Sequence, residues 1–525
     1  MAQRAQAAFE SQRSVLAPRT LPHGSGACDE VIGRICYWYD GDYDPPPREP
    51  EAIKQARGRL LDVLDSAAAA APGDWWIAGQ RVRYLVESAR LPEAAAAARA
   101  CRAEPWWCEA LDGFARHAAG DDAGADSVYA AALADMPAAE RCRWTDLTTL
   151  LEGELRRRFA RLDCAARGPR AAHLWWLAQP LFSRAGNDRR VEHFARHTMV
   201  RMLQRAGSPW SMSLAEDIVE LTLRYGWPVA WSGAIGSGLE MSRSISGYER
   251  QPAFHFIPDA AADSEPGHWN LSPVRPHERY APLYAQAFES LTPDITVFHR
   301  GESTFAVVAY DLTRDTLWRG QSALSRAVVL ARDERMPAVV TRSDDSSRRG
   351  VIVVTAPWPA TVAGLEITQA GTLHVGRARI ALDPGDPALV ATSGLLLFDP
   401  VDSLPEDLLA VLPLVHGRRP VTLGAIGLYW EVYGLAPGEA FDTRVNVRSL
   451  GGGVLRRVGS WLGLGKRSHE TRLAWRDVAQ ENGLVYRAVR VEVGSLEPGH
   501  YRVSVDVTTR GKNVTTAREL EIVRP

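Results

Sequence analysis

Hydrophobic and polar residues follow a helical period through the first part of the chain and a strand period through the last part. From residue 51 to residue 232, apolar positions recur three or four apart, which is the spacing of one buried face of an α-helix. From residue 294 onward, short apolar or alternating runs of period two are separated by turn residues, as in antiparallel sheets. We therefore predict a multidomain chain with a helical N-terminal part and a β-rich C-terminal part.

An internal repeat lies in the helical region. The pair Trp75-Trp76 recurs 31 positions later as Trp106-Trp107. A self-similarity of that length indicates a helix-turn-helix repeat. The second copy resembles a tetratricopeptide repeat, with Gly113 at the small position of its first helix. The resemblance implies an α-solenoid around residues 75–137, and we expect neighbouring helices to extend it because one hairpin cannot bury its apolar face alone.

Residues 171–232 are rich in tryptophan and arginine and separate the helical region from the strand-rich region. We call this segment the helical joint. The apolar spacing predicts three helices in it, at residues 171–181, 188–204 and 214–225. Asn187 or Asp188 is placed to cap the second helix, and Gly226 follows the third as a C-terminal cap would. The composition suits either a buried interdomain contact or a recognition surface.

Three stretches in the joint carry a resemblance to a known family. They are WWLAQPLF, then GNDRR and EHFAR, then LRYGWPVAW, and strand-rich domains follow them. In this arrangement the chain from about residue 142 to residue 525 resembles bacterial GWxTD-domain proteins. It departs from the family in having Trp144-Thr145-Asp146 without the glycine, and Gly226-Trp227 without the Thr-Asp pair. The resemblance implies an exported bacterial protein with an interaction role, and it supplies no catalytic residues.

The strand-rich region follows a connector, residues 233–293, in which we expect one strand at 253–257 and one short helix at 283–291. The period-two runs after it predict two antiparallel β-sandwiches. The sharpest local signal is the stretch from Leu496 to Tyr501, LEPGHY, which has the form of a tyrosine corner. In such a corner the phenol hydroxyl bonds back to nearby backbone, and we therefore predict an immunoglobulin-like fold for the last domain.

The predicted fold is thus an N-terminal α-solenoid followed by two antiparallel β-sandwich domains. A proline run at residues 45–47 closes the first segment, because proline continues neither a helix nor a strand ladder. The predicted parts are a tail (1–50), a tetratricopeptide-like helical domain (51–170), the helical joint (171–232), the connector (233–293), a β-sandwich (294–410) and an immunoglobulin-like β-sandwich (415–525).

Composition and charge exclude some classes of partner. The 525 residues carry a formal net charge of -2, and basic and acidic residues are interleaved, so nucleic-acid binding is not expected. No apolar run approaches the roughly 20 residues that a membrane helix needs, and we expect no integral membrane segment. Residues 451–467 form a short basic amphipathic stretch. We expect it to cap its own sandwich, with weak contact to an anionic membrane surface as the alternative.

The six cysteines fall into three close pairs: Cys28 with Cys36, Cys101 with Cys108, and Cys142 with Cys164. Near-neighbour pairs suit short-range disulfides in an oxidising compartment, which would place the protein in the periplasm or envelope if a signal precedes this sequence. Buried free thiols and a cytoplasmic location are the alternative. One straight helix between the last two cysteines would hold them roughly 33 Å apart, so either that helix breaks or they have other partners.

The strongest metal candidates are His193 and His197, which lie four apart and so on one face of a predicted helix. Phe194 stands where an H-E-x-x-H zinc hydrolase has glutamate, and packing is the favoured interpretation of the pair. The glycine-rich stretches near residues 233–238 and 459–467 lack the spacing of nucleotide-binding loops, so we expect no cofactor.

These observations predict a non-enzymatic scaffold or interaction protein of the bacterial cell envelope, with a protein or peptide as its partner. The alternative is a metal-dependent hydrolase with a site between the joint and the connector, using His193, His197 and His255. The candidate contact residues are the tryptophans of the repeat and the joint, namely Trp75, Trp76, Trp106, Trp107, Trp175, Trp176 and Trp227.

Overall fold

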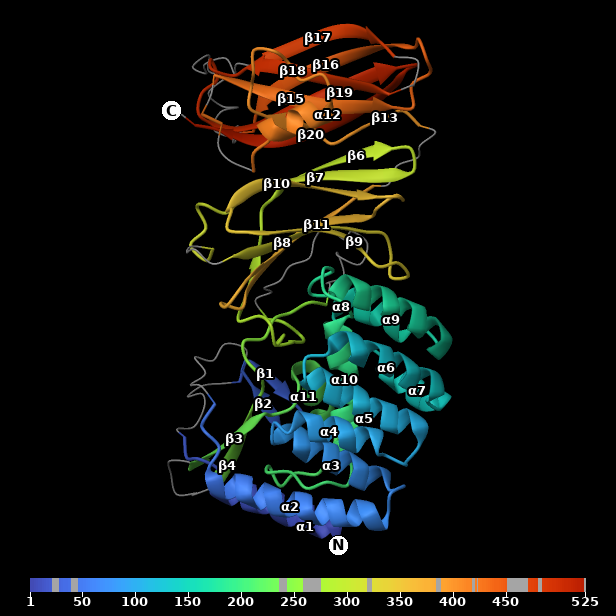
Figure 1. Ribbon diagram of the computed structural model, residues 1–525, viewed down its shortest axis with the longest axis vertical. Helices are drawn as coiled ribbons and strands as arrows, with labels where there is room; N and C mark the ends of the chain where they lie inside the picture. Colours follow the sequence, from blue (N-terminus) through green and yellow to red (C-terminus); the bar gives the residue numbers. More distant parts are fainter. Residues whose placement is uncertain are drawn as a thin grey trace. The chain divides into compact units, whose positions relative to one another are not determined.

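The computed structural model divides the chain into two compact units, Met1–Phe288 and Glu289–Pro525. Helices dominate the first unit and strands the second (Figure 1). This confirms the predicted change from helix to strand along the chain. The structure describes residues 1–20, 28–38, 46–235, 243–257, 275–318, 323–383, 389–417, 421–422, 424–450, 471–479 and 484–523. The basic stretch 451–467 lies outside these residues.

Eleven helices form the described part of the first unit. They are α1 (Ala2–Leu16), α2 (Glu51–Ala70), α3 (Trp75–Glu87), α4 (Leu91–Arg99), α5 (Pro105–Ala118), α6 (Asp122–Asp135), α7 (Ala138–Trp144), α8 (Gly153–Ala160), α9 (Cys164–Ala178), α10 (Asp188–Leu203) and α11 (Glu216–Tyr225). The last three correspond to the helices predicted for the joint. As expected, the Asn187 side chain caps α10 by accepting from the backbone N–H of Arg190, and Gly226 follows α11 with a φ of 99°.

The sequence repeat corresponds to the helix pairs α3–α4 and α5–α6. Gly113 of α5 lies against the ring of Tyr129 of α6, and a Cβ at position 113 would come within 2.8 Å of that ring. The small residue therefore permits close approach of the two helices. Helix α10 packs against α3, α5 and α6, and side chains of all four helices belong to one hydrophobic core. Phe9 of α1 is buried in the same core.

All six cysteines form disulfides, in the three pairs that the sequence suggested. Cys142 and Cys164 can form a disulfide because no single straight helix runs between them. Helix α7 ends at Trp144, and α9 begins at Cys164 after the separate short helix α8. The chain thus doubles back and brings the two Cα atoms to 5.4 Å.

Short strands complete the first unit. Strand β1 (Glu30–Ile32) pairs with β2 (Ile35–Tyr37), and β3 (Ala230–Ile235) pairs with β4 (Arg243–Tyr248). The strand expected at 253–257 is reduced to a single bridge between Phe254 and Tyr280. The short helix expected at 283–291 is wrong, because Ala287–Ser290 forms strand β5. Its four residues are too few for a helical period to be distinguished from a strand period.

Among the described residues, four antiparallel sheets contain the strands of the second unit. The first has the order β10 (Arg349–Ala356), β7 (Ser303–Asp311), β6 (Asp294–Arg300). The second has the order β5, β12 (His374–Ala381), β11 (Val362–Gln369), β8 (Leu324–Ala331), β9 (Val339–Asp345). In the third, β15 (Ala425–Tyr433) pairs with β18 (Val485–Glu492) on one side and with β13 (Ala391–Thr392) and β14 (Leu396–Phe398) on the other. The fourth has the order β17 (Thr471–Val478), β16 (Ala440–Ser449), β19 (Gly499–Thr509), β20 (Lys512–Ile522).

The first and second sheets share one core, and the third and fourth sheets share another. Side chains of β6, β7 and β10 meet those of β8 and β11 in one hydrophobic cluster, and side chains of β15 and β18 meet those of β16, β19 and β20 in another. A short helix, α12 (Leu408–Val411), and a 3₁₀ turn at Leu412–Leu414 lie between these two groups in the sequence. The tyrosine corner is confirmed, since the Tyr501 hydroxyl donates to the carbonyl oxygen of Glu497 at 2.7 Å.

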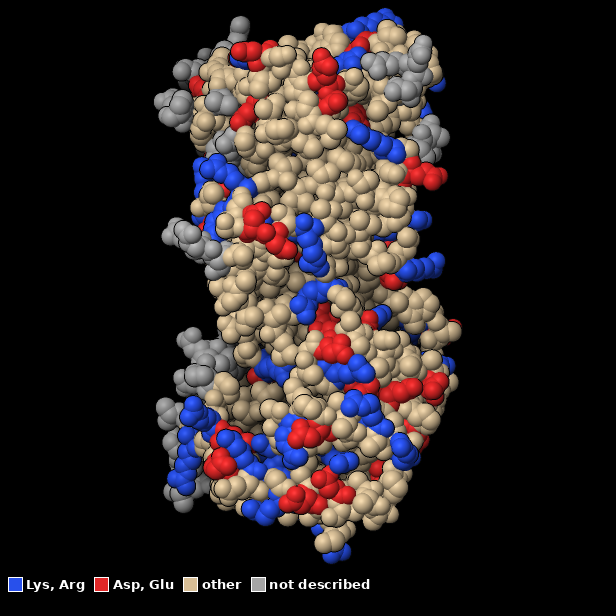
Figure 2. All heavy atoms as spheres, in the orientation of Figure 1, with Lys and Arg blue, Asp and Glu red and all other residues tan. Residues whose placement is uncertain are grey.

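No helix in the described ranges is long and apolar enough to cross a bilayer. Basic and acidic side chains are interspersed on the face shown in Figure 2, as the net charge of -2 leads one to expect. This surface therefore offers no extended field of one sign.

Candidate functional site

Helix α10 is the centre of the helical joint and is buried on most of its surface. Its buried residues include six that are charged or histidine: Asp188, Arg189, Glu192, His193, Arg196 and His197. Burial of a polar group costs free energy unless the group finds a partner. The partners of these side chains therefore indicate the structural role of the joint.

Arg189 forms an ion pair with Glu278 of the connector, with an Nη2–Oε2 distance of 2.5 Å and both side chains fully buried. The other oxygen of Glu278 accepts from the backbone N–H groups of Phe256 and Ile257 at 3.1 and 3.2 Å. His255 adds a contact from Nδ1 to the same oxygen at 2.9 Å. Burial by itself would raise the pKa of Glu278, but attraction to Arg189 and the hydrogen bond with His255 outweigh it and lower the pKa.

A second buried network joins α5, α6, α10 and α11. His117 contacts Asp122 through Nδ1 at 2.8 Å and Glu192 through Nε2 at 2.7 Å. The other oxygen of Glu192 accepts from Arg196, which also donates to the carbonyl oxygens of Leu223 and Arg224 near the end of α11. Burial acts to lower the pKa of His117, but the two carboxylates outweigh it and raise the pKa to about 9. The imidazolium is thus held between two anions.

Asp188 begins α10 and is paired with phenols. Its Oδ2 accepts from the hydroxyls of Tyr280 and Tyr284 at 3.1 and 2.9 Å. Burial and repulsion from Asp122 raise the pKa of Asp188 to about 6, although the two phenols act in the opposite direction. The Arg184 guanidinium lies over the Tyr284 ring at 4.0 Å. These contacts attach the connector to the start of α10.

Three of the four candidate tryptophans of the repeat lie around one arginine of α10. The Arg201 guanidinium lies 4.8, 4.5 and 5.0 Å from ring centroids of Trp75, Trp106 and Trp107. Such cation–π contacts stabilise a packed arrangement by about 0.5–2 kcal/mol each. Of the seven candidates, five are buried, namely Trp76, Trp106, Trp107, Trp175 and Trp176, whereas Trp75 and Trp227 are partly buried. Their role in partner contact stays a prediction.

The histidine pair lies inside the same core. The rings of His193 and His197 are 4.6 Å apart, and His193 Nε2 lies 3.0 Å from the carbonyl oxygen of Trp144. Burial lowers the pKa of His193 well below its usual value and that of His197 to about 3, so both rings are neutral at pH 7. Within the residues that the structure describes, no group of three or more His, Cys, Asp or Glu side chains could hold a metal ion. His255 contacts Glu278.

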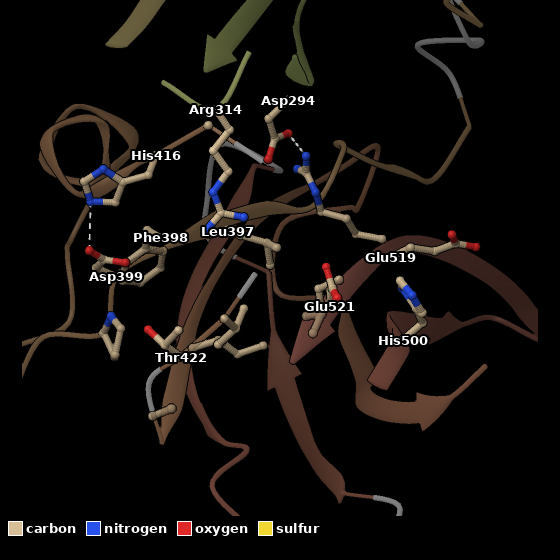
Figure 3. Close-up of a pocket in the computed structure, with 17 residues that line it drawn as sticks. Asp294, Arg314, Leu397, Phe398, Asp399, His416, Thr422, His500, Glu519 and Glu521 are labelled. Atoms are coloured by element: carbon tan, nitrogen blue, oxygen red, sulfur yellow. Dashed lines mark ion pairs between the residues drawn. The ribbon is translucent and has the colours of Figure 1, made fainter. Parts of the chain in front are cut away.

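An open cavity of about 550 Å³ lies in the second unit (Figure 3). Its volume falls within the range of about 300–1,000 Å³ that is usual for ligand sites. Its lining comes from Asp294, Arg314, residues 397–400, 416–417, 421–422, 425–426, His500 and residues 518–521. Strands β14 and β20 thus form two of its sides.

Charged groups lie on opposite sides of this cavity. His416 Nε2 contacts Asp399 Oδ2 at 2.8 Å on one side, whereas Glu519, Glu521 and His500 lie on the other (Figure 3). Arg518 pairs with Asp294 and also donates to the Leu395 carbonyl oxygen at 2.9 Å. In the part of the chain that the structure describes, Glu519 and Glu521 make no ion pair and are exposed.

The described lining of the cavity has few hydroxyl or thiol groups. Thr422 supplies the one hydroxyl of its lining, and no hydrogen bond joins that hydroxyl to a histidine among the described residues. All six cysteines of the chain are in disulfides, so no thiol is available as a nucleophile. None of the lining residues was a sequence candidate. The lining extends from Asp294 to Glu521, and only the folded sheets bring its parts together.

No protein-family model and no curated relative matches the chain. Among solved structures, red sea bream transglutaminase is 10% identical with a TM-score of 0.15, over 45% of this chain and 32% of that one. A Bacteroides uniformis beta-glucuronidase is 8% identical with a TM-score of 0.18, over 42% and 26%. Chicken CNTN1 FN1-FN3 domains are 11% identical with a TM-score of 0.16, over 55% and 84%. The chain spans less than two thirds of the length of both enzymes, and at these TM-scores no functional argument follows.

Proposed function

We propose that this chain is a non-enzymatic interaction protein of the bacterial cell envelope that binds a protein or peptide partner in the cavity of its second unit. The observation that carries the proposal is the cavity itself. It is open, it has the volume of a ligand site, and it presents polar side chains, apolar side chains and strand edges together. The helical unit would then serve as a rigid scaffold for partner binding.

The compartment belongs to the same proposal. Three disulfides that use every cysteine support an oxidising, extracytoplasmic environment, because such bonds are rare where glutathione and thioredoxin keep thiols reduced. The resemblance to exported bacterial GWxTD-domain proteins points to the same place.

The proposed architecture is an α-solenoid with tetratricopeptide character, followed by two β-sandwiches of which the last is immunoglobulin-like. The close approach of Gly113 to Tyr129 supports the first part. Shared cores between pairs of sheets and the hydrogen bond of Tyr501 support the second. Loops and strand edges at the ends of such sandwiches are common places for recognition.

The burial of the joint favours binding over the metal-dependent hydrolase. A hydrolase using His193, His197 and His255 needs a pocket at which they converge. His193 and His197 are instead packed among Trp144, Trp175 and each other, and their pKa values are lowered by burial.

Site-specific photo-crosslinking tests the proposal. A benzophenone amino acid at Thr422 in the cavity is compared with one at Val478, which is 54% exposed on β17 and outside the cavity. After irradiation in an envelope extract of the producing cells, we expect a discrete protein adduct at position 422 that is missing at position 478. The captured protein, once purified, should bind the full chain directly. Equal labelling at both positions, or no adduct at 422, would contradict partner binding in this cavity.

A further inference from the structure

Strand β20 is an edge strand whose backbone groups face the cavity. Val421 donates its N–H to the carbonyl oxygen of Glu521 at 2.7 Å, and Val523 donates to the carbonyl oxygen of Val421 at 3.0 Å. The backbone of Glu521 therefore points away from β19. Since alternate residues of a regular strand point their N–H and C=O groups to the same side, the backbone of Glu519 also points outward.

Strand β14 presents a similar edge to the same cavity. Leu396 and Phe398 are opposite Tyr429 and Gly427 of β15, and the N–H of Asp399 donates away from β15 to the carbonyl oxygen of Leu414. By the same alternation, the backbone of Leu397 points away from β15. Over the described ranges, the N–H and C=O groups of Leu397 and Glu519 have no hydrogen-bond partner, and both residues line the cavity.

One observation and one general property of strand edges indicate what this space is suited to bind. The chain itself already pairs a short extended segment, at Val421, with the Glu521–Val523 end of the β20 edge, so this edge can accept an extended segment at the adjoining position of Glu519. Unpaired strand edges are templates for addition of an extended peptide, with main-chain hydrogen bonds giving affinity and alternate side chains giving specificity.

The side chains of β20 indicate which side chains the added peptide should carry. Glu519 and Glu521 point to the exposed face, whereas Leu520 is buried between them. A residue directly opposite on an added strand has its Cβ about 4.5–5.5 Å away, close enough for a basic side chain to contact Glu519. The neighbouring position on the added strand would face the apolar side, where Leu397 and Leu520 lie.

We propose that the cavity binds an extended peptide segment as an added strand along β20, with alternating basic and apolar side chains and a basic side chain beside Glu519. This rests on the proposed function and specifies the partner: a stretch of protein in extended conformation. Its backbone hydrogen-bonds to the β20 edge, and its charge complements the two glutamates.

Peptides of defined pattern test the proposal on the full chain. The probe is a fluorescein-labelled Lys-Val-Lys-Val-Lys peptide with an amidated C-terminus. It is compared with Glu-Val-Glu-Val-Glu and with the basic peptide N-methylated at every residue after the first, which has no N–H between its residues to donate to the β20 edge. Fluorescence anisotropy should show binding of the basic peptide, with at least tenfold weaker binding of both comparison peptides. Equal binding of the N-methylated peptide would overturn strand addition, and equal binding of the acidic peptide would overturn the charge assignment.

Variants locate the binding. Glu519→Lys should weaken the basic peptide at least tenfold, a change of about 1.4 kcal/mol. Glu519→Gln removes the negative charge without adding a positive one, so it should weaken binding less than Glu519→Lys. Glu519→Pro removes the backbone N–H at an edge position where proline is tolerated, and it should also weaken binding. Glu497→Lys is the matched control, since Glu497 is exposed in the same unit but outside the cavity. It should leave affinity unchanged, and circular dichroism confirms that each variant is folded.

The outcomes separate this inference from the proposed function. If no peptide binds while the crosslink at position 422 persists, strand addition is wrong and partner binding stands. If binding is unaffected by Glu519→Lys, the β20 edge is not the site. Loss of both the crosslink and peptide binding would remove the cavity as a binding site altogether.

Discussion

An ion pair at the centre of the helical joint and an ion pair at the cavity of the second unit differ in burial. In the helical unit, Arg189 and Glu278 are fully buried and paired, and the carboxylate is satisfied by backbone N–H groups as well. In the β-rich unit, His416 and Asp399 contact each other at the cavity with 37% and 41% of their side chains exposed. Buried pairs fix one arrangement, because any other arrangement leaves a charge without a partner. Exposed pairs cost little to rearrange, so they are compatible with recognition.

The helical joint has the amino-acid composition of an active site. Its histidines, acids and arginines have the residue types of a catalytic centre, and several have strongly shifted pKa values. Shifted values cluster at functional sites, but structural ion networks shift them too. The cavity, by contrast, has ordinary residues and open space. In this protein, open space for a ligand distinguishes the candidate site better than shifted pKa values do.

Breaking the buried pair should give the largest effect. Glu278→Ala leaves the Arg189 guanidinium buried without its partner, and we expect the free energy of unfolding of the helical unit to fall by about 3–5 kcal/mol. Urea unfolding followed by tryptophan fluorescence measures it. The double variant Arg189→Met with Glu278→Leu should recover most of the loss. A single-variant loss below about 1 kcal/mol would show that the joint is not held by this pair.

The pH dependence of His117 should give the next largest effect. Its pKa is raised from 6.5 to about 9, so the folded state binds the proton more tightly. The stabilisation is therefore fully present below pH 6.5 and is lost as pH rises toward about 9. The difference in unfolding free energy between the native chain and His117→Gln should shrink across this window by about 3 kcal/mol at most. A difference that stays constant with pH would contradict a buried imidazolium.

Removing the hydroxyl of the tyrosine corner should have a smaller effect. Tyr501→Phe removes one hydrogen bond to the Glu497 carbonyl oxygen, and we expect a loss of about 1 kcal/mol in the second unit. Hydrogen exchange of amides in β19 and β20 measures this locally. Tyr486→Phe is the matched control, because no hydrogen bond of its hydroxyl is found in the described part of the chain. Equal losses in the two variants would remove the corner as a specific stabiliser.

The smallest effect should come from the cavity. His416→Ala breaks a half-exposed pair, for which we expect a change of at most about 0.5 kcal/mol in unfolding free energy. Thermal unfolding of the full chain, with the native chain beside it, tests this. A loss as large as that of Glu278→Ala would mean that the cavity is a structural joint like α10, and the contrast between the units would fail.

Local patterns in the sequence predicted part of the local structure. The helical period predicted α9, α10 and α11, the cysteine spacing suggested the three disulfides, and the six-residue corner motif predicted the hydrogen bond of Tyr501. Each of these depends on residues close together in the chain.

The sites depend on distant residues, and this limited their prediction. Glu278 is 89 positions from Arg189, and nothing in the helix around Arg189 indicates that partner. The cavity depends on the edges of β14 and β20, whose facing residues Leu397 and Glu519 are ordinary members of their strands. Whether a strand lies at an edge is decided by sheet order, which a local pattern does not contain.

The disulfides have a consequence for how the chain matures. Six cysteines allow 15 pairings. The one observed joins the first to the second, the third to the fourth and the fifth to the sixth, over separations of 8, 7 and 22 residues. Each thiol therefore meets its correct partner before the next pair is synthesised or threaded through a membrane. An oxidant that joins cysteines in order of their emergence would produce the native set without later reshuffling.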